Sequence, residues 1–158
     1  QRPLRPHGAD QDPVGLEGAG MKVDSIHTGI VLDHIKAGRG MDVYQKLHLD
    51  ELDCPVAYMR NVRSNAMGRK DIIKIDGSVK LDLDVIGYMD PGVTVNKIEN
   101  SEVVERKHLS LPEYISDVIH CKNPRCITSV EQELPHKFKL TDREKMVYRC
   151  IYCESKAK

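Results

Sequence analysis

The chain has 158 residues with 24 basic and 24 acidic side chains, so its formal net charge at pH 7 is zero. Its 40% hydrophobic and 30% charged residues are typical of a soluble globular protein, and no apolar run approaches the roughly 18 residues that a membrane-spanning helix requires. Zero net charge argues against a protein whose main task is to bind nucleic-acid backbones. The N-terminus lacks a secretory signal pattern, and with five cysteines available as thiols we expect a cytoplasmic protein.

Residues 1–20 contain three prolines and four glycines and show almost no apolar periodicity. We therefore expect a disordered tail or a remnant of recombinant expression, outside the folded part of the chain.

From Met21 onward the pattern predicts a first domain over residues 21–108. We expect a strand through Val23 and Leu32 that ends at Asp33-His34, followed by a helix over 41–48, strands over 56–62 and 71–75, a helix over 81–89, and a hairpin of 93–98 with 102–106. The order strand, helix, strand, strand, helix, strand is that of a ferredoxin-like antiparallel sheet with both helices on one face. The predicted fold class is therefore α+β.

Four cysteines dominate the C-terminal part of the chain. Cys121 and Cys126 form a C-x4-C pair, and after a gap of 23 residues Cys150 and Cys153 form a C-x2-C pair. Two close pairs can fold their loops onto one ion, and four thiolates form the closed tetrahedral shell that Zn²⁺ prefers, so we expect one structural zinc ion per chain. Two disulfides or unrelated buried thiols are the alternatives. Cys54 stands apart and is expected to be a packed strand residue.

Residues 109–158 are accordingly expected to form a small zinc-ribbon-like β domain that depends on its metal. A helical turn over 113–118 should lead into the first cysteine pair, and short β-like runs are predicted at 129–130, 137–140 and 146–149.

No sequence motif of a common catalytic site is present: we find no phosphate-binding loop, HExxH, GxSxG or strand-to-helix GxGxxG. In the run from Arg69 to Lys74, strand alternation places Lys70, Ile72 and Lys74 on one face. Two ammonium groups on either side of an apolar contact suit a phosphorylated ligand with a flat apolar part, although a solvated strand face has the same pattern.

Further polar residues could join this face. Asp33 and His34 end the first strand, Asn96 and Ile98 share a face of the fourth, and Arg106 closes the fifth. If these residues converge, they supply an acid, an amide and cations to one pocket. A turn role for Asp33 and a surface or core role for His34 are the simpler alternatives.

Several stretches together resemble a known family. TGIVLDHI, MGRKDIIKI, TVNKIEN, EVV, SLPE and C-x-N-P-x-C-I followed by YRCIYCE occur in order over residues 21–155 and are similar to the regulatory chain of aspartate carbamoyltransferase. The resemblance implies a non-catalytic chain with a nucleotide-binding domain, which binds CTP and UTP as inhibitors and ATP as activator. It also implies a zinc domain that docks on the catalytic chain, and a homodimer of regulatory chains.

The resemblance carries residue roles as well. It implies that Asp33, His34, Lys70 and Lys74 contact the base, ribose and phosphates, with Ile72 between the lysines. The base would be framed by Val23, Asp24, Ser25 and Ile26, and the opposing wall formed by Asn96, Ile98, Ser101 and Val103. Ser101 stands where other members have a tyrosine, and Arg106 replaces a phosphate-binding lysine with Lys107 beside it. Asn123 and Glu154 match positions that contact the catalytic chain.

Two readings from other classes remain. A zinc-ribbon adaptor could bind nucleic acid through a basic face made of Lys137, Lys139, Arg143, Lys145 and Arg149, but zero net charge and one Phe, six Tyr and no Trp argue against it. A nucleotide-metabolising enzyme would need a nucleophile paired with a base, and none is evident. We therefore expect no nucleic-acid partner and no membrane partner.

Overall fold

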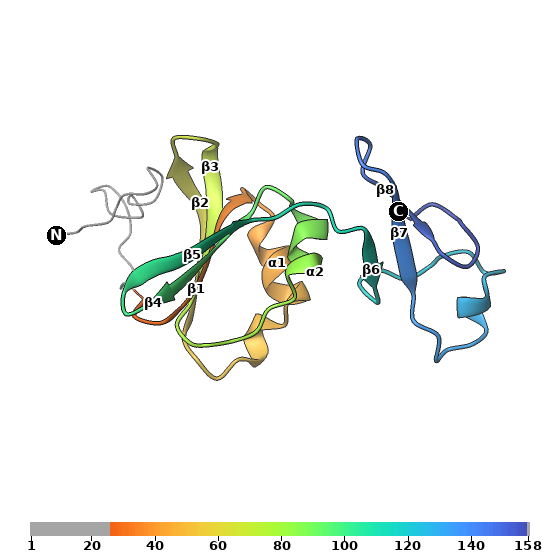
Figure 1. Cartoon of the computed structure of the whole chain (residues 1–158), viewed down its shortest axis with the longest axis horizontal. Helices are drawn as coiled ribbons and strands as arrows, with labels where there is room; N and C mark the ends of the chain where they lie inside the picture. The colour runs from red at the N-terminus through yellow and green to blue at the C-terminus, as the bar shows by residue number, and fades with distance from the viewer. Residues whose placement is uncertain (1–25, 158) are drawn as a thin grey trace.

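A computed structural model describes residues 26–157. Two antiparallel sheets and two short helices make up this part of the chain, in the arrangement that Figure 1 shows. The first group of elements comprises β1 (Gly29–Lys36), α1 (Gly40–Lys46), β2 (Val56–Ser64), β3 (Gly68–Ile75), α2 (Leu83–Met89), β4 (Thr94–Glu99) and β5 (Glu102–His108). The second group comprises β6 (Tyr114–Ser116), β7 (Lys137–Asp142) and β8 (Val147–Cys150).

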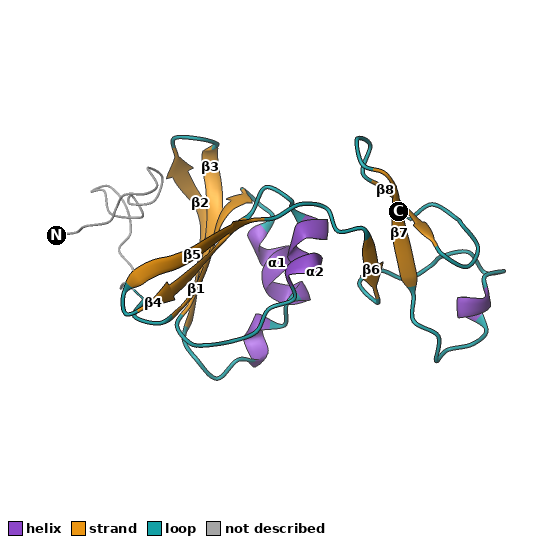
Figure 2. Ribbon diagram, in the orientation of Figure 1, coloured by secondary structure: helices purple, strands orange, loops and turns teal. Residues whose placement is uncertain are grey.

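The first sheet has five strands in the order β2-β3-β1-β4-β5, and every neighbouring pair is antiparallel. The first four strands in this order, β2-β3-β1-β4, have the ferredoxin-like arrangement, and β5 extends the sheet at one edge. Both helices cover the same face of this sheet, as Figure 2 shows, so no helix from residues 26–157 lies on the other face, which is called the helix-free face below. The α+β fold class predicted from the sequence is confirmed.

The core of this first part lies between the sheet and the helices. Alternate residues of the strands point toward the helices, where Val43 of α1 and Ile86 of α2 close the layer. The fully buried strand side chains include Leu32, Ile35, Ile73 and Ile75. Because these positions face the helices, their neighbours in sequence must face the opposite, helix-free side.

Bulges interrupt strands β1 and β2, and a third register shift lies between Lys97 and Ile98 of β4. The register shifts in β1 between Leu32 and Ile35, where His34 has φ 62°, and in β2 between Met59 and Val62, where Asn61 has φ 63°. The prediction that the first strand ends at Asp33-His34 is wrong: β1 continues to Lys36, because the extra residue of the bulge returns Ile35 to the core. The first half of that predicted strand, residues 21–25, lies outside the described residues.

The second sheet has the order β6-β7-β8 and covers a separate small core, which includes Phe138, Tyr148 and Ile115. The predicted helical turn over 113–118 is wrong, because residues 114–116 alternate between exposed and buried and pair with β7 as a strand. The run at 129–130 is also not extended, since a 3₁₀ turn, Ile127–Ser129, occupies that segment. β7 and β8 lie where short strands were predicted.

The helices face the second sheet as well as the first, so they lie between the two (Figure 1). The Lys46 ammonium at the end of α1 donates to the Val118 carbonyl over 3.3 Å. Tyr88 of α2 meets Tyr148 of β8 edge to face, with 5.0 Å between ring centroids. A Cβ atom at Gly87 would lie 2.5 Å from the Ser110 carbonyl oxygen, so this glycine allows α2 to pack against the linking segment.

Candidate functional site

The helix-free face of the five-stranded sheet gathers the polar residues that the sequence singled out. Strand register places Val31 opposite both Lys74 and Asn96, and Asn96 opposite Arg106. These four residues therefore form one row across β3, β1, β4 and β5. On one side of this row Ile98 lies opposite Val103. The sheet thus brings residues from four strands onto one surface.

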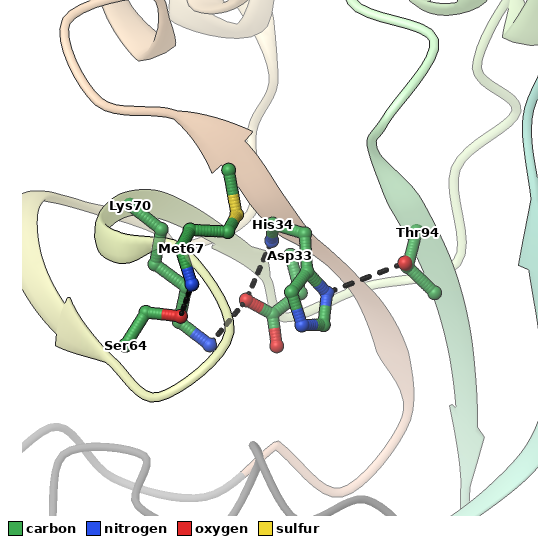
Figure 3. A network of polar contacts seen from close by, with 6 residues as sticks. All are labelled: Asp33, His34, Ser64, Met67, Lys70 and Thr94. Atoms are coloured by element: carbon green, nitrogen blue, oxygen red, sulfur yellow. Dashed lines mark hydrogen bonds and ion pairs between the residues drawn. The ribbon is translucent and has the colours of Figure 1, made fainter.

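A buried ion pair lies beside this row (Figure 3). The Lys70 ammonium is 2.9 Å from a carboxylate oxygen of Asp33, and the two side chains are only 2% and 8% exposed. The same Asp33 oxygen accepts a hydrogen bond from the His34 backbone N–H over 2.7 Å, which fixes the carboxylate at the β1 bulge. This pair holds a cation and an anion in defined positions at the edge of the candidate site.

His34 projects from the bulge toward β4. Its ring Nδ1 lies 3.3 Å from the Thr94 hydroxyl, and Thr94 itself is buried on the helix-free face opposite Asp33. Thr94 can therefore orient the imidazole ring of His34, a residue that the sequence analysis placed in the candidate site.

Lys74 differs from Lys70 in its electrostatic environment. Burial lowers the pKa of its ammonium, and the negative charge of Asp33 opposes that shift. Within residues 26–157 Lys74 makes no ion pair, and the buried Oδ1 of Asn96 in the same row lacks a hydrogen-bond partner. A cation and an amide oxygen in this state favour a ligand that carries both an anionic group and an N–H donor.

The register of β5 distinguishes two adjacent cations. Arg106 lies opposite Asn96 on the helix-free face, whereas Lys107 lies opposite the core residue Val95 and approaches Glu105 to 3.8 Å. Arg106 is therefore the cation that belongs to the candidate site. Ile72 lies on the same face between the two lysines and is 2% exposed.

The remaining predicted site residues differ in their burial, and some lie outside the described residues. Ile26 is buried just before β1, and Ser101 lies exposed at the tip of the β4–β5 hairpin, where its N–H donates to the His27 carbonyl over 2.8 Å. That N–H is consequently used within the chain. Val23, Asp24 and Ser25 lie outside the described residues.

This face also carries Val31, Thr94 and His108, which were not predicted from the sequence as site residues. Each is two positions from a predicted residue on the same strand, so strict alternation along the strands would have found them. Thr94 and His108 lie directly opposite each other.

The four clustered cysteines form a second candidate site. Their sulfur atoms all lie within 4.8 Å of one another, with Cys121 3.6 Å from Cys153 and Cys126 3.7 Å from Cys150. The sulfurs of a tetrahedral metal site with metal–sulfur bonds of about 2.3 Å are separated by about 3.8 Å. All five cysteines are free, so the predicted disulfide alternative does not describe this cluster. The residues present fit one tetrahedral metal ion.

Hydrogen bonds to the sulfurs support the thiolate form that a metal needs. The Thr128 hydroxyl donates to Cys126 Sγ over 3.1 Å and lowers the pKa of that thiol. At Cys153 burial acts to raise the pKa, but hydrogen bonds from Ser155 and Asn123 prevail and lower it to about 6. The Tyr152 N–H donates to Cys150 Sγ over 3.4 Å, but burial raises the pKa of that thiol and raises the pKa of Cys121 to about 12, so these two thiols need the metal's charge to ionise.

The two predicted interface residues lie beside this cluster. Asn123 joins the two cysteine loops, because its amide nitrogen donates to Ser155 Oγ and its amide oxygen accepts from Arg125 N–H. Glu154 is exposed with φ 64° directly after the last cysteine.

Comparison with known proteins connects the two sites. Residues 21–110 match the model of the aspartate carbamoyltransferase regulatory chain allosteric domain, and residues 113–158 match that of its metal-binding domain. The regulatory chain of Clostridium acetobutylicum is 48% identical over 134 residues, covering 85% of this chain and 92% of its own. Those of Clostridium tetani and Bifidobacterium longum are 46% and 41% identical, with 85% and 87% of this chain covered and 94% and 99% of theirs.

The chain belongs to the aspartate carbamoyltransferase regulatory chain family. It is accordingly a non-catalytic subunit with an allosteric and a metal-binding domain, as the sequence resemblance implied. The allosteric-domain match contains the whole five-stranded sheet, and the metal-binding match contains all four clustered cysteines. In the described part of the chain, neither helix has the length and hydropathy needed to span a bilayer.

Two hollows lie outside the polar row of this family member. The larger, of about 960 Å³, is lined by both helices and by residues 116–118 of the second part, including Lys46 and Val118. The smaller, of about 330 Å³, is lined by the loop at Gly77 and by the ends of β1 and β4, and it reaches Ile98. Neither is lined by Lys70 or Lys74.

Proposed function

We propose that the helix-free face of the sheet binds CTP, UTP and ATP in competition, and that these nucleotides act as allosteric effectors of the catalytic chain. The observation that carries this proposal is the row Lys74, Val31, Asn96 and Arg106, which places two cations and a buried amide oxygen on one surface. Lys74 and Arg106 would hold the phosphates, and Asn96 would accept an N–H from the base. The proposed nucleotide-binding domain comprises residues 21–108.

Further contacts in this proposal come from the β1 bulge. Asp33 and His34 would contact the ribose and base, with Lys70 holding the Asp33 carboxylate at 2.9 Å and Thr94 orienting the His34 ring. Ile26, Ile98 and Val103 would provide apolar contacts to the base, and Ile72 would separate the lysines. Val23, Asp24, Ser25 and Ser101 complete the proposed set.

The metal in this proposal is a structural Zn²⁺ ion held by the four cysteines in a domain of residues 109–158. Four sulfur ligands leave no position for substrate, so the ion would stabilise the loops without taking part in chemistry. Asn123 and Glu154 lie on these loops and would contact the catalytic chain. Exposed Ile127 and Val130, which follow the first cysteine pair, would add apolar contacts to the same surface.

The subunit proposed here is a cytoplasmic homodimer that joins catalytic trimers. Both edge strands of the first sheet, β2 and β5, expose one side of their backbone, and every residue of β5 is exposed. We expect the isolated chain to sediment as a dimer at micromolar concentration. A monomer alone in analytical ultracentrifugation would contradict this part of the proposal.

Calorimetric titration of CTP and ATP into the zinc-loaded chain tests the effector site. We expect each nucleotide to displace the other, and Lys74→Ala to weaken both by roughly tenfold or more, as expected for one charge-assisted contact. Asp33→Ala should weaken them as well, because it removes the partner of Lys70. Lys97→Ala is the matched control, since Lys97 follows Asn96 on β4 but points to the other face.

Nucleotide affinities that are equal in Lys74→Ala and Lys97→Ala would contradict the placement of the site. No binding at millimolar nucleotide would contradict the effector function of the free chain.

The nucleic-acid adaptor has less support in the structure. Of its five basic residues, Arg143 donates to the Leu111 carbonyl and Arg149 to the Glu154 carbonyl, so two guanidinium groups are engaged within the domain. Steeply salt-dependent binding of the chain to nucleic acid would favour the adaptor.

A further inference from the structure

Asp71 is a buried carboxylate that the proposed effector site does not use. It is 0% exposed and lies on β3 directly after Lys70. Successive residues of a strand point to opposite faces, so Lys70 reaches the helix-free face while Asp71 points toward the helices. A single peptide unit therefore joins the candidate effector face to the layer beneath it.

Four donors from two separate segments hold the Asp71 carboxylate. One oxygen accepts the Asn61 N–H over 2.8 Å, and the other accepts Gly40 N–H at 2.9 Å, Gly38 N–H at 3.2 Å and the Tyr58 hydroxyl at 3.1 Å. Asn61 and Tyr58 belong to β2, whereas Gly38 and Gly40 lie at the start of α1. The carboxylate thus links β3, β2 and the first turn of α1.

The segments around Asp71 are positioned with little tolerance. A Cβ atom at Gly40 would lie 2.4 Å from the Tyr58 ring and 2.7 Å from the Asp71 carboxylate, so the start of α1 packs directly against both. On the outer side, Lys70 holds Asp33 at the β1 bulge, and on the inner side Asp71 holds Asn61 at the β2 bulge. A shift of Lys70 along or across the sheet would move Asp71 with it.

The start of α1 is also tied to the end of α2. The Lys36 N–H donates to the Asp90 carboxylate over 2.8 Å, and the Arg39 guanidinium donates to the Met89 carbonyl. At their other contacts, α1 reaches the second part of the chain through Lys46 and Val118, and α2 reaches it through Tyr88 and Tyr148. Continuous contacts therefore run from Lys70 through Asp71 to both helices and on to the metal-binding domain.

We infer that Asp71 is a positioning residue that couples the effector face to the metal-binding domain through the first turn of α1. This inference rests on the proposed function, because it assigns the route by which a nucleotide on that face alters the distant part of the chain. Asp71 contacts no ligand itself. Its effect is on the coupling between sites, which is separate from the affinity for nucleotide.

The test uses the holoenzyme reassembled from catalytic trimers and zinc-loaded chain. For each variant, the half-saturating aspartate concentration is measured with and without saturating CTP, and the CTP affinity of the free chain is measured by calorimetry. We expect Asp71→Asn to bring the ratio of the half-saturating aspartate concentrations with and without CTP toward one. The CTP affinity of the free chain should change by less than about threefold, because Lys70 and Lys74 keep their own contacts. Tyr58→Phe removes a single donor to Asp71 and should reduce the shift in part.

Ile75→Val is the control, since Ile75 is a fully buried residue of β3 on the same face as Asp71 and bonds to neither helix start. It should lower thermal stability and keep the CTP-induced shift. If Asp71→Asn does not fold, Tyr58→Phe decides the question. The inference would be overturned if the Asp71 and Tyr58 variants showed the full CTP-induced shift at saturating CTP, even with weakened CTP affinity. It would also be overturned if Ile75→Val lost as much of the shift as Asp71→Asn.

A second readout needs no nucleotide. Hydrogen exchange of the backbone amides of residues 117–120, which follow β6 beside Lys46, should be faster in Asp71→Asn than in wild type and unchanged in Ile75→Val. Equal exchange in all three proteins would overturn the coupling. If wild type binds no CTP, the proposed function fails, and the exchange experiment still tests the route.

Discussion

Lys70 and Lys74 lie four residues apart on the same face of β3, opposite to the face of Asp71 and Ile75, yet the surroundings of the two lysines differ. Lys70 is paired with Asp33 at 2.9 Å, whereas burial lowers the pKa of Lys74 with only partial compensation from Asp33. A partly buried cation without an ion pair destabilises the folded state. A ligand that supplies a negative charge beside Lys74 would offset this cost.

We therefore predict that Lys74→Met raises the free energy of unfolding at pH 7 and weakens CTP and ATP binding by roughly tenfold or more. The destabilisation by Lys74 should be complete below its folded pKa and should disappear as pH rises from that value to 10.5, where the unfolded lysine also loses its proton. Urea unfolding of both proteins at neutral and alkaline pH measures this. A wild-type protein that is more stable than Lys74→Met at pH 7 would contradict the prediction.

The strand face of the candidate site residues could be predicted from the sequence, but their ion-pair and hydrogen-bond partners could not. Alternation along β3 put Lys70, Ile72 and Lys74 on one face, and the structure agrees. The partner of Lys70 could not be predicted, because the Asp33 carboxylate reaches it only through the β1 bulge and its register with β3. The network of Asp71 was hidden for a similar reason: three of its donors are backbone N–H groups, which carry no sequence signal.

Among the elements, strands and helices with strong periodicity were predicted and short or irregular ones were not. α2 benefits from Asp82, whose carboxylate caps the helix by accepting from Asp84 N–H and Val85 N–H. β6 was missed because a strand of three residues shows too little alternation to be distinguished from a helical turn. The cysteine cluster could still be predicted, because the spacing of the four cysteines indicates it without knowledge of the strands around it.

We expect the second sheet to depend on a metal ion for its folding. Its core is small, and Cys126 and Cys150 are themselves part of it. Four thiols that must ionise together without a cation would repel one another, so metal binding contributes directly to folding. The first sheet has its own core of nine buried residues and does not share these side chains.

We predict that chelation of the metal unfolds residues 113–157 and leaves the five-stranded sheet folded. In a ¹⁵N-labelled chain, amide resonances of the second sheet should collapse to random-coil positions while those of β1 to β5 persist. Cys126→Ser should have the same effect as chelation, and Cys54→Ser, outside the cluster, should not. Loss of both sheets together, or of neither, would contradict this account.

At the scale of the whole molecule, the two helices lie between the two sheets (Figure 1). They pack against the sheet on one side and contact the metal-binding domain through Lys46 and Tyr88 on the other. A ligand on the far face of the sheet can affect a catalytic partner only if it binds two states of the assembly unequally. The sequence resemblance indicated this division of tasks, but the contacts between the parts required the three-dimensional structure.

The most direct test of the account is the aspartate saturation curve of reassembled holoenzyme with and without nucleotide, measured with wild-type and Lys74→Ala chains. We predict that CTP and ATP shift the half-saturating aspartate concentration in opposite directions in wild type, and that both shifts shrink at the same nucleotide concentration in Lys74→Ala. The unliganded curves of the two holoenzymes should coincide. Curves that do not respond to nucleotide in wild type, or that respond equally in Lys74→Ala, would contradict the account.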